Sequence, residues 1–206
     1  MSPRTTDPAA AVVAARAAGC LDLDALADRA RGCVACEDLA AARTNVVVGD
    51  FPANARLLLV GEAPGAQEDL VGRPFVGKAG LLLDALLAEA QVDRASTAVA
   101  NVLKCRPPGN RAPTRAEAAR CSGWLDQQLA LLDPWLVVTL GGTALAWALG
   151  HGVRLRDARG RIHDWRGRQL LVTYHPSAAI RFGPAGEPMA ALRADLRRVG
   201  ELLCAS

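Results

Sequence analysis

Four short segments of this chain consist almost entirely of consecutive apolar residues: 56–61, 97–102, 135–141 and 169–174. Continuous apolar runs of this length are typical of strands that are covered on both faces of a parallel sheet. The pattern therefore predicts a central, mainly parallel four-stranded sheet.

Segments with apolar residues at helical spacing alternate with these runs. The longest, residues 114–132, begins with the capping-box pattern that joins Thr114 to Glu117. The others are expected over residues 79–90, 143–149 and 188–203. Strands that alternate with helices predict an α/β fold of three layers, α/β/α.

The ends of the chain and its length set the domain organisation. We expect residues 21–206 to form one domain, with a short helix over 21–31, because 206 residues suit a single core. Residues 1–20, which are rich in alanine and contain Pro3 and Pro8, are expected to form a flexible leader. A glycine between two extended runs in 159–172 predicts a hairpin before the last strand.

Composition and charge narrow the class of protein. With 51% hydrophobic and 22% charged residues the chain is expected to fold, and no apolar run approaches the roughly 18–20 residues that span a bilayer. We therefore expect no membrane partner and a cytoplasmic location. Residues 1–100 carry 9 basic and 13 acidic side chains, whereas residues 101–206 carry 15 and 8. The basic half permits contact with a polyanion.

Four of the six cysteines form a candidate metal site. Cys33 and Cys36 are a Cys-x2-Cys pair, Cys105 and Cys121 follow downstream, and two cysteines lie near the chain ends. In a reducing compartment such thiols bind metal more often than they form disulfides. Residue type alone fits zinc and iron–sulfur equally.

The loops that follow the four predicted strands carry unusual residues. They read GEAPG (61–65), NVLKCRPPGNR (101–111), GGT (141–143) and YHPS (174–177). Because ligands of parallel α/β sheets bind beyond the carboxyl ends of the strands, we expect these loops to form one site. The first loop lacks the glycine spacing of dinucleotide and nucleoside triphosphate cradles.

Taken together, the segments GEAPGAQEDLVGRPFVGKAG, NVLKCRPPGNRAP and HPSAAIR, with Cys-x2-Cys upstream, resemble the family-4 uracil-DNA glycosylases, the iron–sulfur branch of their superfamily. The resemblance extends from about Cys33 to the C-terminus. It implies a monomeric hydrolase that flips uracil out of single- or double-stranded DNA and leaves an abasic site. It also implies a 4Fe-4S cluster on Cys33, Cys36, Cys105 and Cys121.

The resemblance also assigns roles to single residues. Phe75 would stack on uracil, Asn101 would read its edge, and His175 would donate a hydrogen bond to the departing base. Gly61, Glu62 and Ala63 would line the base pocket, and Ser177, Arg181 and Arg106 would contact DNA. Without the resemblance, His175 also fits a core histidine and Asn101 a turn or cap.

The group that activates water stays open. Ala63 stands where some branches have a catalytic aspartate, so Glu62 and Glu68 are the candidate carboxylates and Asn110 is a candidate for positioning water. Gly65 replaces the aromatic residue that excludes thymine in another branch.

Three other functions remain as alternatives. One is a non-catalytic iron–sulfur module that binds nucleic acid, and another is a glycosylase of broader specificity. The third is the branch that stays covalently attached to DNA. Its extra basic loop is missing, because residues 106–117 run directly into a helix.

Overall fold

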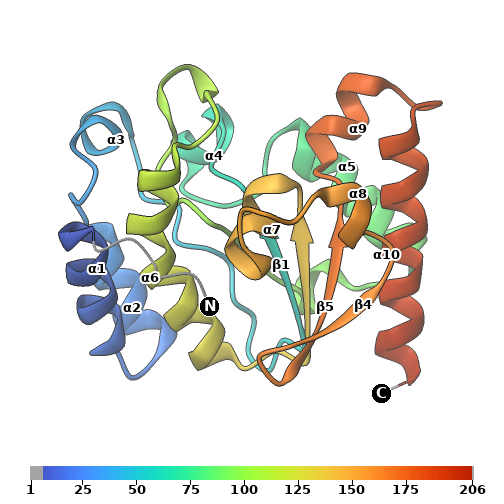
Figure 1. Ribbon diagram of the computed structural model, residues 1–206, viewed down its shortest axis with the longest axis horizontal. Coiled ribbons are helices and arrows are strands. Elements are labelled where there is room, and N and C mark those ends of the chain that lie inside the picture. The colour runs from blue at the N-terminus through green and yellow to red at the C-terminus, as the bar shows by residue number, and fades with distance from the viewer. Residues whose placement is uncertain (1–6, 206) are drawn as a thin grey trace.

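A computed structural model describes residues 7–205 of the chain. Its centre is a five-stranded sheet in the order β2-β1-β3-β5-β4 (Figure 1). Strands β1 (Leu57–Gly61), β2 (Ala98–Asn101), β3 (Leu136–Leu140) and β5 (Arg168–Thr173) are parallel, and β4 (Ile162–Trp165) pairs antiparallel with β5. The three-layer α/β fold is confirmed, but the number of strands was wrong.

The strand that was not predicted is β4, at one edge of the sheet. The hairpin predicted around it is present, with Arg166 and Gly167 at positive φ in a two-residue turn. β4 carries the polar residues His163 and Asp164 and is only partly buried, so it lacks the continuous apolar run that predicted the other four strands.

Helices cover both faces of the sheet. One face packs against α3 (Glu37–Ala42), α6 (Arg115–Leu132) and α7 (Gly142–Leu149) through side chains such as Leu58, Leu125 and Leu145. The other packs against α5 (Lys78–Glu89), α9 (Pro176–Phe182) and α10 (Glu187–Ala205). Two shorter helices, α4 (Ala66–Val71) and α8 (Leu155–Ala158), precede α5 and β4. The 3-10 turns are η1 (Arg94–Ser96) and η2 (Pro108–Asn110).

The leader predicted over residues 1–20 is wrong for residues 8–18, which form helix α1 (Pro8–Ala18). Asp7 caps this helix and Pro8 occupies its first turn, where proline favours a helix start. Val13 and Ala17, four residues apart, are buried in a small core shared with Trp124 of α6. Residues 1–6 lie outside the described part of the chain.

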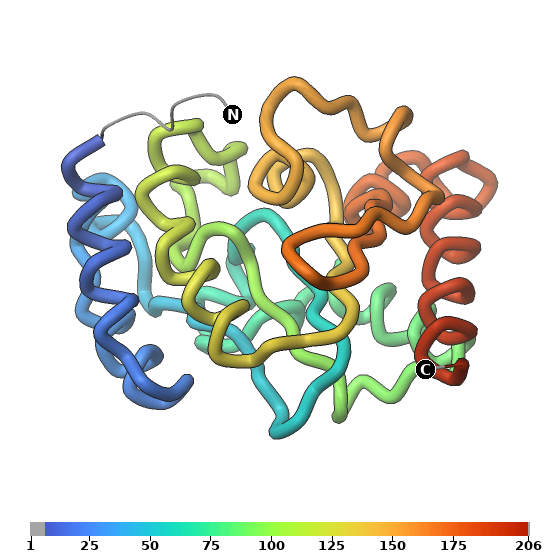
Figure 2. The backbone as a smooth tube through the Cα atoms, turned by 60° about the horizontal axis from the view of Figure 1, so that its bottom comes forward, coloured from blue at the N-terminus to red at the C-terminus, as the bar shows by residue number. Residues whose placement is uncertain are grey.

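The helices at the two ends of the chain lie on opposite sides of the molecule. Figures 1 and 2 both show α1 and α2 (Leu23–Arg31) beside α6, with α10 at the far side of the sheet.

Within the described residues, no helix is long and apolar enough to cross a membrane.

Candidate active site

The loops at the carboxyl ends of the strands enclose a cavity of about 260 Å³. The predicted residues that it brings together are Glu62, Ala63, Glu68, Phe75, Asn101, Asn110, His175 and Ser177. Pro64, Gly65, Ala79, Pro107 and Arg111 complete the lining. Gly61, Arg106 and Arg181, also singled out from the sequence, do not line it.

Gly61 lies behind the cavity wall, and its lack of a side chain leaves room for the side chains of Asn101 and Phe75. It pairs with Asn101 across strands β1 and β2. A Cβ atom on Gly61 would lie 2.4 Å from Asn101 Oδ1 and 2.6 Å from Phe75 Cζ. Only a residue without a side chain allows the Asn101 amide and the Phe75 ring to occupy this space together.

Asn101 carries a polar atom that the folded chain leaves unsatisfied. The side chain is 3% exposed, and its Oδ1 has no hydrogen-bond partner among the described residues. A buried acceptor without a donor costs about 1–3 kcal/mol, so such an atom in a cavity wall points to a ligand that donates to it. Its place at the end of β2 does not fit a helix cap.

Phe75 and His175 place two rings side by side at the cavity. Their centroids are 5.8 Å apart and the ring planes are inclined by 32°. Phe75 is held in the left-handed backbone region, at φ 54°, which is rare for an aromatic residue. It is 7% exposed and packs partly in the core, so it serves both the core and the cavity wall.

His175 caps the start of α9 with its ring. Its Nδ1 accepts the Ser177 backbone N–H at 3.2 Å and lies 2.8 Å from Ser177 Oγ. An accepting Nδ1 assigns the proton of the neutral ring to Nε2. Burial lowers the pKa of His175 to about 4, with Glu68 acting in the opposite direction, so the ring is neutral at physiological pH. The site thus holds a neutral N–H donor.

Both candidate carboxylates line the cavity, and each has one oxygen held. Glu68 is 9% exposed, and its Oε1 accepts the Gly77 backbone N–H at 2.7 Å. Glu62 is half-buried, and its Oε2 accepts the hydroxyl of Thr143 at 2.5 Å.

Asn110 and Arg111 form the cavity wall opposite the strand ends. The Arg106 Nε donates to Asn110 Oδ1 at 2.7 Å, and the NH₂ group of Asn110 takes no part in this hydrogen bond. Arg111 was not predicted. It forms a two-pronged ion pair with Glu117, at 2.9 and 2.6 Å, and this contact lowers the pKa of Glu117 to about 2. The capping-box glutamate was the only sequence signal for that pair.

Two comparisons with known proteins bear on this arrangement. The sequence model of the uracil DNA glycosylase superfamily matches residues 48–197, which include every residue that lines the cavity. This chain belongs to that superfamily.

Relatives within the superfamily match most of this chain. A type-4 uracil-DNA glycosylase of Thermotoga maritima is 43% identical over 77% of this chain and 83% of its own. Type-4 uracil-DNA glycosylases of Pyrobaculum aerophilum and Saccharolobus solfataricus are 40% and 36% identical, over 78% and 88% of this chain and 86% and 87% of theirs. The family that the motifs indicated is confirmed.

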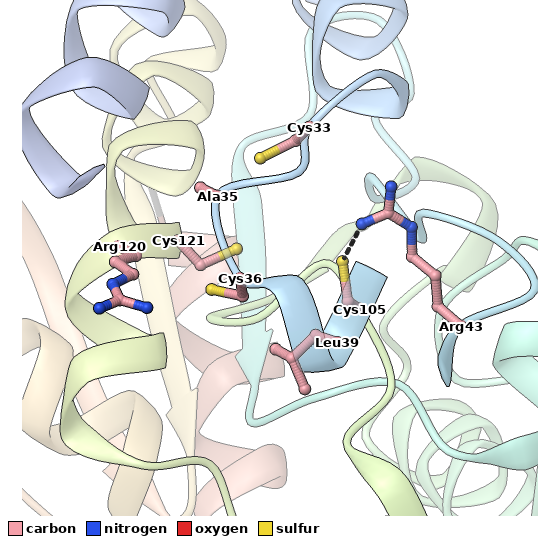
Figure 3. A pocket seen from close by; sticks show the side chains of 8 residues that line it. All are labelled: Cys33, Ala35, Cys36, Leu39, Arg43, Cys105, Arg120 and Cys121. Atoms are coloured by element: carbon pink, nitrogen blue, oxygen red, sulfur yellow. Dashed lines mark hydrogen bonds between the residues drawn. The ribbon is translucent and has the colours of Figure 1, made fainter. Parts of the chain in front are cut away.

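In this member of the uracil-DNA glycosylase superfamily, the four predicted cysteines lie around a second, smaller cavity (Figure 3). Cys33 and Cys36 come from the segment before α3, Cys105 from the loop after β2, and Cys121 from α6. The remaining lining is Ala35, Leu39, Arg43 and Arg120, with no carboxylate or imidazole. Among the described residues, no three His, Cys, Asp or Glu side chains are placed to hold a single metal ion.

Hydrogen-bond donors approach two of the sulfur atoms of this cavity. Arg43 Nη1 donates to Cys105 Sγ at 3.1 Å, and the Lys104 backbone N–H donates to Cys121 Sγ at 3.3 Å. Burial raises the pKa of the Cys36 and Cys105 thiols, and raises that of Cys121 to about 12. Thiolates rather than thiols ligate metals, so a metal bound here would favour the ionised form of these side chains. The donor set fits a group that four thiolates ligate.

Lys104 connects the two cavities, a role that no motif in the sequence indicated. It is 1% exposed, and its Nζ donates to the Asn101 backbone carbonyl at 2.8 Å and to Gln128 Oε1 at 2.6 Å. Burial lowers the pKa of Lys104 to about 8. The residue next to Cys105 therefore holds the backbone of the residue that lines the larger cavity.

Proposed function

We propose that this chain flips uracil out of DNA into the larger cavity and hydrolyses its N-glycosidic bond, which leaves an abasic site and starts base excision repair. The observation that carries the proposal is the buried Asn101 Oδ1, which has no hydrogen-bond partner within residues 7–205, together with the neighbouring rings of Phe75 and His175. Membership of the superfamily and the type-4 relatives support it.

Base recognition rests on the Asn101 amide and the Phe75 ring. Uracil presents a donor at N3 and an acceptor at O4, so Asn101 Oδ1 accepts from N3–H and its NH₂ donates to O4. Cytosine presents the reverse pattern and leaves Asn101 mispaired. Phe75 gives the flipped base a surface on which to stack.

Bond cleavage needs charge stabilisation on both fragments. When the bond between uracil N1 and the sugar C1′ breaks, its electron pair stays on the base, and His175 Nε2–H donates to uracil O2. The oxocarbenium-like sugar is stabilised by a carboxylate, for which Glu62 and Glu68 are the candidates. A water oxygen then bonds to C1′, and its proton leaves to a carboxylate or to solvent. Asn110 positions this water.

DNA contacts surround the cavity mouth. Ser177 lines the cavity, Arg181 is exposed on α9 and Arg106 adjoins Asn110, and we propose that all three contact backbone phosphates. Ile180, an apolar side chain that is 45% exposed on α9, is the candidate to fill the space that the flipped base leaves. We propose that the protein acts as a monomer.

A 4Fe-4S cluster is the group we assign to Cys33, Cys36, Cys105 and Cys121. Four thiols without other ligand types, together with donors such as Arg43 toward sulfur, support iron–sulfur ligation. When bound, the cluster supplies a covalent link among the Cys33–Cys36 segment, the loop after β2, and α6. Thiolate ligands of this kind persist in a reducing cellular compartment, which is consistent with a cytoplasmic protein.

Replacing Cys105 by serine is expected to abolish iron binding and to reduce soluble yield, because metal-binding energy is also folding energy. Iron and acid-labile sulfide, measured with the visible absorbance of anaerobically purified protein, report the loss. Cys204, exposed on α10, and Cys20, buried in the core beside α1, are the matched positions, and their serine variants should keep the iron. Stoichiometric zinc without iron in the wild-type protein would contradict the cluster.

The proposed reaction is tested with an oligonucleotide that carries one uracil, in which excision creates an alkali-labile break. Asn101→Asp removes the donor to O4 and should reduce uracil excision by roughly 10- to 100-fold, the size of one mispaired buried group. It should also admit some cytosine. Asn54→Asp, in an exposed loop before β1, is the control. DNA binding without any break in the wild type would instead indicate a non-catalytic module.

A further inference from the structure

The turn after β3, residues 141–143, contacts two groups of the proposed site without lining the cavity. Thr143 is half-buried in the first turn of α7, and its Oγ1 lies 2.5 Å from Glu62 Oε2. The two atoms lie within hydrogen-bond distance, with the hydroxyl as donor and the carboxylate oxygen as acceptor.

The same turn approaches His175. The Gly141 N–H donates to the Thr173 carbonyl at 2.9 Å, at the end of strand β5 that leads into His175. Gly141 has φ +88°, and a Cβ atom on it would lie 3.0 Å from His175 Cβ. The position of Thr143 is therefore fixed against both the strand that carries His175 and the carboxylate of Glu62.

The two candidate carboxylates differ in how they are held. A backbone N–H, that of Gly77, holds Glu68. A side-chain hydroxyl, that of Thr143, holds Glu62, and the link crosses from α7 to the loop after β1. With one oxygen of Glu62 fixed by Thr143, the carboxylate cannot rotate freely about its last bond. A glutamate side chain without this hydrogen bond would lose its rotational freedom only in the transition state, at a cost in conformational entropy.

We propose that Thr143 is a positioning residue for glycosidic-bond cleavage, whose hydroxyl holds one oxygen of Glu62 so that the other oxygen is available to the deoxyribose and the attacking water. This inference rests on the proposed function, and it selects Glu62 as the carboxylate that acts on the reacting atoms.

Thr143→Val removes the hydroxyl and keeps the shape of the side chain. We expect it to reduce the single-turnover rate on saturating uracil-containing oligonucleotide by roughly 10- to 100-fold, the size of one hydrogen bond to a charged group. The half-saturating DNA concentration should change less than about threefold, since Thr143 contacts neither the base nor the backbone in the proposal. Thr143→Ser, which restores the hydroxyl, should recover most of the rate.

A double-mutant cycle tests whether Thr143 acts through Glu62. In Glu62→Gln the charge to be positioned is absent, so adding Thr143→Val should cost less than about threefold more. In Glu68→Gln the same addition should cost its full factor, because the two losses are independent. Equal losses in the two backgrounds would overturn the inference.

Two further outcomes would overturn it as well: a Thr143→Val rate within twofold of wild type, or a Thr143→Ser variant as slow as Thr143→Val, which indicates packing alone. If Thr143→Val does not fold, as judged by thermal unfolding, Thr143→Ala replaces it, because alanine is well tolerated in a helix. If the wild-type protein cleaves the oligonucleotide and the Thr143 variants cleave it at the same rate, this inference alone is refuted. A wild-type protein that does not cleave refutes the proposed function itself.

Discussion

Replacing His175 by serine should lower single-turnover cleavage of uracil-containing DNA by roughly 10²–10³-fold, the usual loss for one donor aimed at developing charge. The Nε2–H donates to uracil O2 most strongly when the base carries the charge of the broken bond. Affinity for DNA, measured with a duplex in which the uracil nucleotide resists cleavage, should change far less, because phosphate contacts supply most of it.

Two comparisons make this prediction specific to His175. His151→Ser, at an exposed position after α7, should leave the rate near that of the wild type. Because burial lowers the pKa of His175 to about 4, the ring stays neutral above that pH, and its protonation should not limit the rate between pH 5 and 8. A loss of DNA affinity equal to the loss of rate would return His175 to a structural or DNA-positioning role.

Gly61→Ala should reduce uracil excision by about 10²-fold or more while the protein stays folded. The added methyl group would lie 2.4 Å from Asn101 Oδ1 and 2.6 Å from Phe75 Cζ, so the amide and the ring must move apart. Displacements of about 1 Å among positioning groups cost this much in other enzymes. Single-turnover rates and thermal unfolding, measured together, separate a damaged site from a damaged fold.

The control for Gly61→Ala is another glycine with free space around it. In the part of the chain that the structure describes, no atom lies within 4 Å of the position of a Cβ on Gly152, and its φ is not positive. Gly152→Ala should therefore retain wild-type excision. If Gly61→Ala also stayed within a few-fold of wild type, the close meeting of Asn101 and Phe75 would not matter for recognition.

The sequence indicated those parts of the fold that a local pattern determines. The four parallel strands are mostly apolar runs because helices cover them on both faces. The edge strand β4 lacks that pattern, since polar residues such as His163 are tolerated there. Helix α1 was misread because Pro8 indicated a loose segment, whereas its buried residues Val13 and Ala17 become meaningful only beside α6.

The candidate site shows the same division. The strand-end loops that carry Glu62, Asn101 and His175 could be placed from the sequence, since the carboxyl ends of parallel strands share one edge. The supporting contacts could not. Thr143 contacts Glu62 and Lys104 contacts Gln128, and both partners are distant in sequence. Neither Thr143 nor Lys104 lies in a distinctive local pattern.

The loop after β2 serves both cavities with a short stretch of chain. Asn101 lies at its start, Cys105 lines the second cavity, and Asn110 lines the first. The number of residues between them is constrained, because adding or deleting a residue would move at least one of the three side chains away from its cavity. Most surface loops absorb such length changes at little cost. This loop is therefore expected to be among the segments of the molecule least able to change length, although residues 108–111 are exposed to solvent.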